Sequence, residues 1–194
     1  MLPWAPRAAM ASVASLRALL SRETGFAAMQ EVLPFRGLWI GPEMAARSPA
    51  VLREQGITHI LSCNGQPPLI ASLPGFRDAF TLRVVDLDDM PGEDIIGHVA
   101  ACNEFIDAGR AQKSLSGAAG GVLVHCTMGM SRSAAVVIAY VMCAQRCAYD
   151  DAFALVRRVR PWVQPNAGFV AQLRVRAPLL LPRGSASTRM RCVV

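Results

Sequence analysis

Cys126 and Arg132 are the two side chains with the clearest chemical use, and they bracket a short loop. The apolar run 121–125 leads into Cys126, Gly129 lies in mid-loop, and a long apolar stretch follows Arg132. A strand, a tight loop and a helix in this order direct backbone N–H groups and the positive end of the helix dipole at one spot. Such a spot binds anions, and phosphate fits it.

The two side chains also suit chemistry on the bound phosphate. The positive field of the loop favours the thiolate form of Cys126, which is the nucleophilic form. Arg132 can bind two phosphate oxygens at once, a geometry that lysine cannot reproduce. A thiolate beneath a phosphoryl group is placed to attack phosphorus. The simpler interpretation, an inert buried thiol and a surface arginine, does not account for the matched strand and helix on either side.

The positive charge of the chain lies mostly at its ends. The 194 residues carry a formal net charge of +6. Residues 1–22 and 178–194 each contain three arginines and no acidic residue, whereas the charges of residues 23–177 cancel. A domain that follows a phosphate backbone needs its basic residues on the folded part. We therefore expect no nucleic-acid partner.

Cysteine, histidine and hydropathy patterns exclude several other classes of protein. The six cysteines form no Cys-x-x-Cys pair and the three histidines are dispersed, so we expect no metal site. The longest apolar run, 134–144, is far short of the roughly 20 residues of a membrane span, so we expect no stable membrane insertion. Free thiols are typical of a reducing compartment and favour the cytoplasm.

The first 28 residues are expected to lie outside the folded domain. They consist mainly of Ala, Ser, Leu and Arg, with no acidic residue before Glu23. This composition is typical of a transit peptide, which would favour the mitochondrion or another organelle. A disordered extension, or a functional start at Met29, explains it equally well. We expect the domain over residues 29–177 and a basic tail over 178–194.

Strands and helices are predicted to alternate along the domain. We expect strands at 37–41, 57–62, 81–87 and 121–125, and helices at 48–55, 93–109, 131–145, 150–160 and 167–177. This order indicates an α/β domain, with a largely parallel central sheet flanked by helices on both faces. Ligands of such sheets bind beyond the carboxyl ends of the strands, where the polar loops 63–65, 86–92 and 125–132 are expected.

The segment His125–Ser133 resembles the signature loop of the cysteine-dependent protein phosphatases, specifically the dual-specificity family. The resemblance covers about residues 32–177 and includes the segments 38–41, 56–60 and 165–173. It implies transfer of the phosphoryl group to Cys126 and hydrolysis of the phosphocysteine by water, without a metal or other cofactor. It also implies that the substrate phosphate is bound by the loop residues Thr127, Met128, Gly129, Met130, Ser131 and Arg132.

The leaving oxygen of a phosphate ester needs a proton, so a carboxylic acid must lie near the loop. Asp86, Asp88 and Asp89 are the candidates. In the family this acid lies six residues before the apolar residue that opens the next helix. Counting back from Ile95 gives Asp89, with Asp88 as the alternative.

The resemblance implies roles for further residues. Ser133 matches the hydroxyl that stabilises the departing thiolate, His125 a histidine that orders the loop through hydrogen bonds, and Asn166 a supporting turn. Arg160 matches a position that borders the pocket in some relatives, where it would contact a second phosphate. Cys63 matches a cysteine that pairs with the catalytic one in some relatives, although a buried core thiol is the simpler interpretation.

The side chains of the loop bear on the substrate. Relatives that act on inositol phospholipids tend to carry lysine in this loop, and here Thr127, Met128 and Met130 are uncharged. We therefore expect a phosphorylated protein as partner, with phosphotyrosine and phosphoserine or phosphothreonine as substrates. The alternatives are the same chemistry on a phosphoinositide, a phosphoglycan or an RNA 5′-triphosphate, or a non-catalytic phosphate-binding module. The oligomeric state is left open.

Overall fold

The computed structural model describes residues 28–113, 117 and 119–180, and contains a five-stranded sheet. Its strands are β1 (Gln30–Glu31), β2 (Leu38–Pro42), β3 (Ile57–Ser62), β4 (Thr81–Val84) and β5 (Gly121–Cys126). They lie in the order β1-β2-β5-β3-β4, and every pair is parallel except β1 with β2. The predicted, largely parallel sheet is thus confirmed, and β5 lies at its centre.

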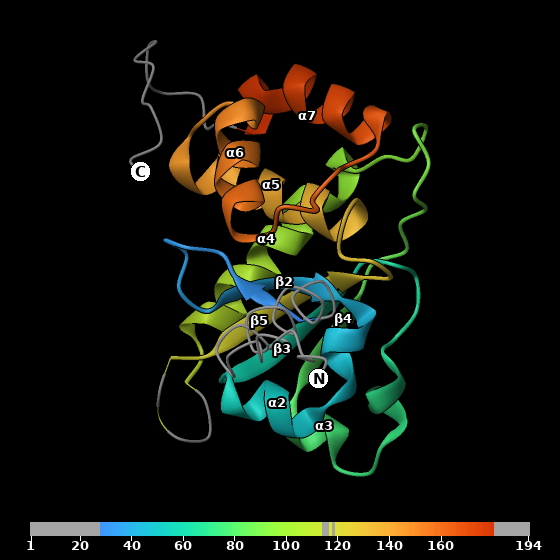
Figure 1. Cartoon of the computed structure of the whole chain (residues 1–194), viewed down its shortest axis with the longest axis vertical. Helices are drawn as coiled ribbons and strands as arrows, with labels where there is room; N and C mark the ends of the chain where they lie inside the picture. The colour runs from blue at the N-terminus through green and yellow to red at the C-terminus, as the bar shows by residue number, and fades with distance from the viewer. Residues whose placement is uncertain (1–27, 114–116, 118, 181–194) are drawn as a thin grey trace, which may run out of the picture.

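Helices cover both faces of the sheet, as predicted (Figure 1). One face is covered by α4 (Ile96–Ala111), α5 (Arg132–Gln145), α6 (Tyr149–Val159) and α7 (Ala167–Leu180). The short helices α2 (Pro49–Glu54) and α3 (Phe76–Ala79) lie on the other face, and η1 (Glu43–Arg47) and η2 (Leu69–Ser72) are 3₁₀ turns. Ser48 caps α2, since its hydroxyl accepts a bond from the Val51 N–H.

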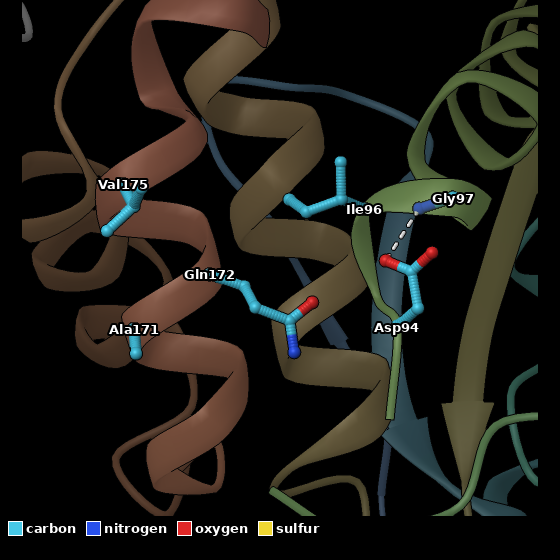
Figure 2. Close-up of a pocket in the computed structure, with 6 residues that line it drawn as sticks. All are labelled: Asp94, Ile96, Gly97, Ala171, Gln172 and Val175. Atoms are coloured by element: carbon cyan, nitrogen blue, oxygen red, sulfur yellow. Dashed lines mark hydrogen bonds between the residues drawn. The ribbon is translucent and has the colours of Figure 1, made fainter. Parts of the chain in front are cut away.

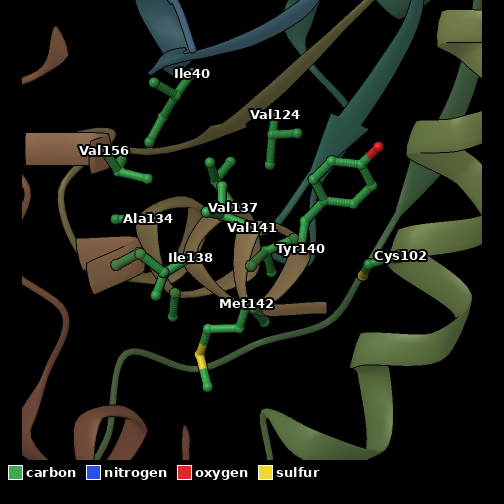
Figure 3. Packing of buried hydrophobic residues seen from close by; sticks show 14 of the residues in the cluster. Ile40, Cys102, Val124, Ala134, Val137, Ile138, Tyr140, Val141, Met142 and Val156 are labelled. Carbon is green, nitrogen blue, oxygen red and sulfur yellow. The ribbon is translucent and has the colours of Figure 1, made fainter. Parts of the chain in front are cut away.

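The central strand is buried on both faces, which explains its continuous apolar run. Val122 and Val124 of β5 pack into a large cluster with α4, α5, α6 and α7, whereas Leu123 packs into a smaller cluster with α2 and α3. Helix α5 is buried at every position from Ser133 to Met142. Figure 3 shows its side chains among those of Ile40, Val124 and Val156. The strand and the helix that flank the Cys126 loop are therefore held by the core.

Several element ends differ from the prediction by one to three residues, and two of the three-residue differences lie next to the acidic loop, residues 86–92. The strand expected over 81–87 ends at Val84, after which the chain leaves the sheet. The helix expected from Glu93 begins at Ile96, because the Asp94 carboxylate accepts the Gly97 N–H at the helix start. Strand β1 and helix α3 were not predicted, since two and four residues are too short for a periodic pattern.

Parts of the predicted organisation lie outside the described residues. These are the extension as far as residue 27 and the tail from residue 181 onward. Among the helices that the structure describes, none is long and apolar enough to cross a membrane.

Candidate active site

The loop between β5 and α5 turns sharply across the end of β2. Gly129 has a φ of +67°, a left-handed conformation that side chains rarely adopt. A Cβ atom on Gly129 would lie 2.6 Å from the carbonyl carbon and oxygen of Gly41. The glycine thus allows the loop to fold back against β2, and this close approach explains why it stands in mid-loop.

All five carbonyl oxygens of the loop residues 127–131 accept hydrogen bonds from groups around the loop. Thr127 accepts from the Glu43 N–H (3.3 Å), Met128 and Gly129 from the Arg160 guanidinium (3.0 and 2.7 Å), Met130 from the Gln164 N–H (2.8 Å), and Ser131 from the Ala135 N–H (2.8 Å). A trans peptide carries its N–H and C=O on opposite sides. Because the carbonyls are held by the surroundings, the N–H groups face the interior of the loop.

Cys126 lies at the floor of this loop. Its Sγ accepts a bond from the Gly129 N–H at 3.2 Å and lies 3.2 Å from the Ser133 Oγ. The backbone N–H groups of residues 127, 128, 130 and 131 donate to no other group in the part of the chain that the structure describes. A ring of inward N–H groups around a sulfur atom matches an oxyanion centred above that sulfur.

Arg132 closes the ring from the first residue of α5. Its Nη2 donates to the Thr127 Oγ1 (3.0 Å) and its Nη1 to the Leu87 carbonyl (3.3 Å). Its Nε is buried and makes no hydrogen bond to a described residue; the nearest acidic atom, Asp89 Oδ2, is 4.0 Å away. Buried N–H groups are rarely left unpaired, so this donor fits an anion at the loop.

The loop therefore combines a nucleophile, an oxyanion cradle and a fixed positive charge within one short segment. This combination can bind a phosphate monoester and attack its phosphorus. Across the described residues, no group of three or more His, Cys, Asp or Glu side chains is placed to hold a metal ion.

Comparison with known proteins identifies the family. Residues 38–177 match the sequence model of the family described as "Dual specificity phosphatase, catalytic domain". The chain belongs to the dual-specificity phosphatase family. This confirms the resemblance seen in the sequence, and the matched segment contains the whole loop with Cys126 and Arg132.

Named relatives agree with this assignment. The chain is 40% identical to the "Dual specificity protein phosphatase MPK-4" of Drosophila melanogaster, over 72% of this chain and 34% of that protein. It is 43% identical to the human "Serine/threonine/tyrosine-interacting protein", over 75% of this chain and 63% of that protein. The Yvh1 phosphatase domain from Chaetomium thermophilum has a similar structure, with a TM-score of 0.69 at 30% identity over 78% of this chain and 96% of that one. The chain thus spans less than two thirds of the two full-length relatives.

The acidic loop, residues 86–92, brings Asp89 to the phosphate loop, residues 126–132. Asp89 Oδ1 accepts bonds from the Ser131 hydroxyl and from the Asn166 Nδ2 (2.9 Å). Its other oxygen, Oδ2, is the one nearer to Arg132. Asp86 and Asp88 are exposed and have no such contacts with the loop. Among the three candidate carboxylates, the geometry therefore favours Asp89.

Helix α7 supports the acidic loop from behind. The Gln172 side chain donates to the Glu93 carbonyl (2.7 Å) and accepts from the Ile95 N–H (3.2 Å). Asn166 caps the helix by accepting the Phe169 N–H (3.0 Å). Figure 2 shows Gln172 reaching from α7 toward the start of α4, beside a cavity of about 540 Å³ that also contacts Asp94 and Val175. This cavity lies behind the acidic loop and not at Cys126.

Gly168 on α7 is in close contact with the acidic loop. A Cβ atom there would lie 1.9 Å from the Pro91 carbonyl oxygen, so we expect Gly168→Ala to displace the loop that carries Asp89. A misplacement of about 1 Å can cost roughly 10²-fold in rate, and we expect a loss of kcat/KM for an aryl phosphate of this order. The control is Gly92→Ala in the same loop, where nothing lies within 4 Å of the added atom. Equal activity of the two variants would contradict the packing argument.

The structure places the other predicted residues as follows. Ser133 lies beside the Cys126 sulfur, and Asn166 lies beside Asp89. Cys63, at the end of β3, is a buried free thiol whose pKa is raised well above its usual range by burial and, to a lesser extent, by Cys102 and Cys126. Its backbone N–H donates to the His125 carbonyl at 2.8 Å.

Two expectations do not fit the geometry. Arg160 is fully buried behind the loop and donates to its carbonyls, so its guanidinium does not face a second phosphate. His125 is also fully buried, and neither ring nitrogen has a hydrogen-bond partner of good geometry among the described residues. The ring therefore packs beneath the loop beside the Cys126 backbone, and no side-chain hydrogen-bond network among the described residues joins it to the loop.

His125 should make the stability of the domain sensitive to acid. Burial lowers the pKa of His125 to about 4 from 6.5, while contact with the Cys126 backbone acts weakly in the other direction. Between pH 6.5 and about 4, the unfolded chain binds a proton at this histidine and the folded chain does not. The free energy of unfolding therefore decreases as the pH falls through this range. The free energy of unfolding decreases by about 3 kcal/mol over this range. Urea unfolding at several pH values measures it, with His125→Gln as the reference that removes this dependence.

A second buried histidine acts in the same direction, since burial also lowers the pKa of His59. His125→Gln should thus flatten the stability profile only in part. An unchanged slope between pH 6.5 and 4 in that variant would contradict the assignment to His125.

Several residues that shape the site were missed by the sequence interpretation. The Glu43 and Gln164 N–H groups and the Leu87 carbonyl act through backbone atoms, so no side-chain pattern indicates them. Gly168 has a signal in the sequence, because it is a glycine in the first turn of a predicted helix. A close approach of another backbone segment, here Pro91, is one reason for glycine at such a position.

Proposed function

We propose that this chain is a metal-independent protein phosphatase that hydrolyses phosphotyrosine and phosphoserine or phosphothreonine through a phosphocysteine at Cys126. One observation carries the proposal: the loop carbonyls are bonded outward, the Gly129 N–H donates to the Cys126 sulfur, and the buried Arg132 Nε at the start of α5 has no hydrogen-bond partner among the described residues. This arrangement stabilises two negative charges on the phosphoryl oxygens and holds the phosphorus above the nucleophile. Membership of the dual-specificity phosphatase family supports the same reaction.

In the first step the Cys126 thiolate attacks phosphorus. The S–P bond forms as the P–O bond to the leaving alcohol or phenol breaks, and the leaving oxygen takes a proton from Asp89. Because Ser131 and Asn166 both donate to Oδ1, that oxygen is the better site for negative charge and Oδ2 for the proton. The Arg132 guanidinium stabilises the charge on the transferred group.

In the second step water attacks the phosphocysteine. The Asp89 carboxylate accepts a proton from the water as the new P–O bond forms, and the S–P bond breaks to return the thiolate. The Ser133 hydroxyl, 3.2 Å from the sulfur, donates a hydrogen bond to the departing thiolate. Inorganic phosphate then leaves and Asp89 is again protonated.

The phosphoprotein substrate rests on two supports. The relative from Drosophila melanogaster is named as a dual specificity protein phosphatase. The loop also adds no charged side chain of its own besides Arg132, as Thr127, Met128 and Met130 are neutral. A substrate with several phosphates would leave its additional charges without partners at this loop.

The cytoplasm is the compartment that we propose for this activity. The five cysteines within the described residues are free thiols, which suits a reducing environment. An organelle remains the alternative if residues 1–28 act as a transit peptide, and imaging of the full chain beside a chain that starts at Met29 distinguishes the two.

Turnover of an aryl phosphate by the purified full chain tests the reaction. We expect hydrolysis that is unchanged by a chelator, followed by preference for phosphopeptides over a phosphoinositide, a phosphoglycan and an RNA 5′-triphosphate. Tight phosphopeptide binding without turnover would instead identify a phosphate-binding module. Faster turnover of any non-protein substrate would overturn the assigned substrate class.

A further inference from the structure

Arg160 is a fully buried charged residue whose guanidinium donates hydrogen bonds to the phosphate loop and to the start of the described chain. It follows the last residue of α6, and its burial lowers the pKa of the guanidinium to about 10, an effect that the nearby Cys126 opposes. Its Nε donates to the Gly129 carbonyl (2.7 Å) and its Nη2 to the Met128 carbonyl (3.0 Å). A buried cation is costly unless its N–H groups are paired, and here they are paired with consecutive carbonyls of one loop.

These two hydrogen bonds determine the direction of two peptide groups. The Met128 carbonyl belongs to the same peptide as the Gly129 N–H, which points to the opposite side and donates to the Cys126 sulfur. The Gly129 carbonyl likewise belongs to the peptide of the Met130 N–H. By holding both carbonyls on the outside, Arg160 keeps both N–H groups turned toward the anion.

The remaining end of the guanidinium contacts a segment far away in the sequence. Nη1 donates to the Ala28 carbonyl (3.1 Å) and to the Gln30 Oε1. Gln30 begins the edge strand β1, so one side chain joins the start of the described chain to the phosphate loop. A planar group with donors on three sides can make all of these bonds simultaneously.

We propose that Arg160 is a positioning residue that holds the phosphate loop in its anion-binding form and couples it to the segment Ala28–Gln30. The inference rests on the proposed function, because it assigns to Arg160 the orientation of the amides that bind the substrate phosphate. Arg160 touches neither the substrate nor the reacting atoms. Lysine cannot replace it, since one ammonium group on a flexible stem cannot hold two adjacent carbonyls in fixed directions.

The test compares Arg160→Lys with Arg158→Lys, a matched change at an exposed arginine in the last turn of α6. Inhibition by inorganic phosphate reports affinity for the anion, and amide hydrogen exchange reports the state of residues 127–131. For Arg160→Lys we expect faster exchange in the loop, about tenfold weaker phosphate inhibition, and about 10²-fold lower kcat/KM. Arg158→Lys should match the unaltered protein in all three measurements.

Gln30→Ala supplies a milder variant, in case the change at Arg160 prevents folding. This substitution removes the Gln30 Oε1 that accepts from the Arg160 Nη1, and it leaves both hydrogen bonds from Arg160 to the loop carbonyls. Loss of one hydrogen bond to a charged group should weaken phosphate inhibition by roughly fivefold or more. Wild-type exchange rates and phosphate affinity in the folded Arg160→Lys protein would overturn the positioning role, and unchanged affinity in Gln30→Ala would overturn the coupling.

The outcomes separate this inference from the proposed function. If the unaltered protein neither binds phosphate nor turns over an aryl phosphate, the proposed function fails. Hydrogen exchange in the loop then still decides whether Arg160 holds it. If the unaltered protein is active and the Arg160→Lys protein is equally so, only the positioning role fails.

Discussion

Cys126→Ser should reduce turnover of an aryl phosphate on the order of 10⁴-fold or more, because the hydroxyl is a far weaker nucleophile than the thiolate. The serine oxygen would occupy the place where the Gly129 N–H and the Ser133 hydroxyl meet the sulfur. The cradle itself is built from backbone groups and Arg132, so the variant should still bind inorganic phosphate. Steady-state kinetics measures the first effect and calorimetry with phosphate the second.

Cys143→Ser is the matched control, since Cys143 is a half-buried free thiol further along α5. Its activity should equal that of the unaltered chain. Retention of turnover by Cys126→Ser, or loss of turnover by Cys143→Ser with Cys126 intact, would refute the assigned nucleophile. Mass spectrometry of a rapidly acid-quenched reaction adds a direct test, because the phosphoryl group should be found on Cys126.

Asp89→Asn should lower kcat by about 10²- to 10⁴-fold, the usual contribution of a positioned general acid. The loss should be largest for alkyl phosphates, whose leaving oxygen is strongly basic, and small for an aryl phosphate with a weakly basic leaving group. Kinetics across a series of leaving groups measures this effect.

Asp88→Asn provides the comparison, because Asp88 is an exposed carboxylate adjacent in the chain. It should leave the dependence on the leaving group unchanged. If Asp88→Asn showed the larger loss for alkyl phosphates, the acid would be Asp88 and the contacts of Asp89 with Ser131 and Asn166 would serve only to close the loop.

The strand–loop–helix unit around Cys126 was predictable because each of its parts has a local cause. A continuous apolar run predicts a central buried strand, and β5 extends over Gly121–Cys126 as expected, with one more residue than predicted. The apolar stretch after Arg132 predicts a buried helix, and α5 ends at Gln145 as expected. Asp89 follows from the resemblance, by counting back six residues from Ile95, and it lies within hydrogen-bond distance of Ser131 and Asn166, although its role as the acid stays a prediction.

Arg160 could not be understood from the sequence. The resemblance to relatives places it near the loop, but it does not tell which side of the loop the side chain faces. That side depends on how α6 packs against α5 and on the position of β1, whose two residues have no detectable pattern. A charged side chain is also expected at the surface, and its complete burial becomes understandable only in the folded chain, where the loop carbonyls and the segment 28–30 accept its hydrogen bonds.

The burial of α5 has a consequence for how the site meets its ligand. Arg132 is the first residue of a helix that is enclosed by the core over ten consecutive positions, from Ser133 to Met142. The loop before it is fastened by four carbonyl bonds to Glu43, Arg160 and Gln164, and a fifth carbonyl accepts a bond from α5. The anion site is therefore assembled in advance, and little of the binding free energy is lost to ordering the protein. Such preorganisation leaves most of the attraction between cradle and phosphate available to the transition state.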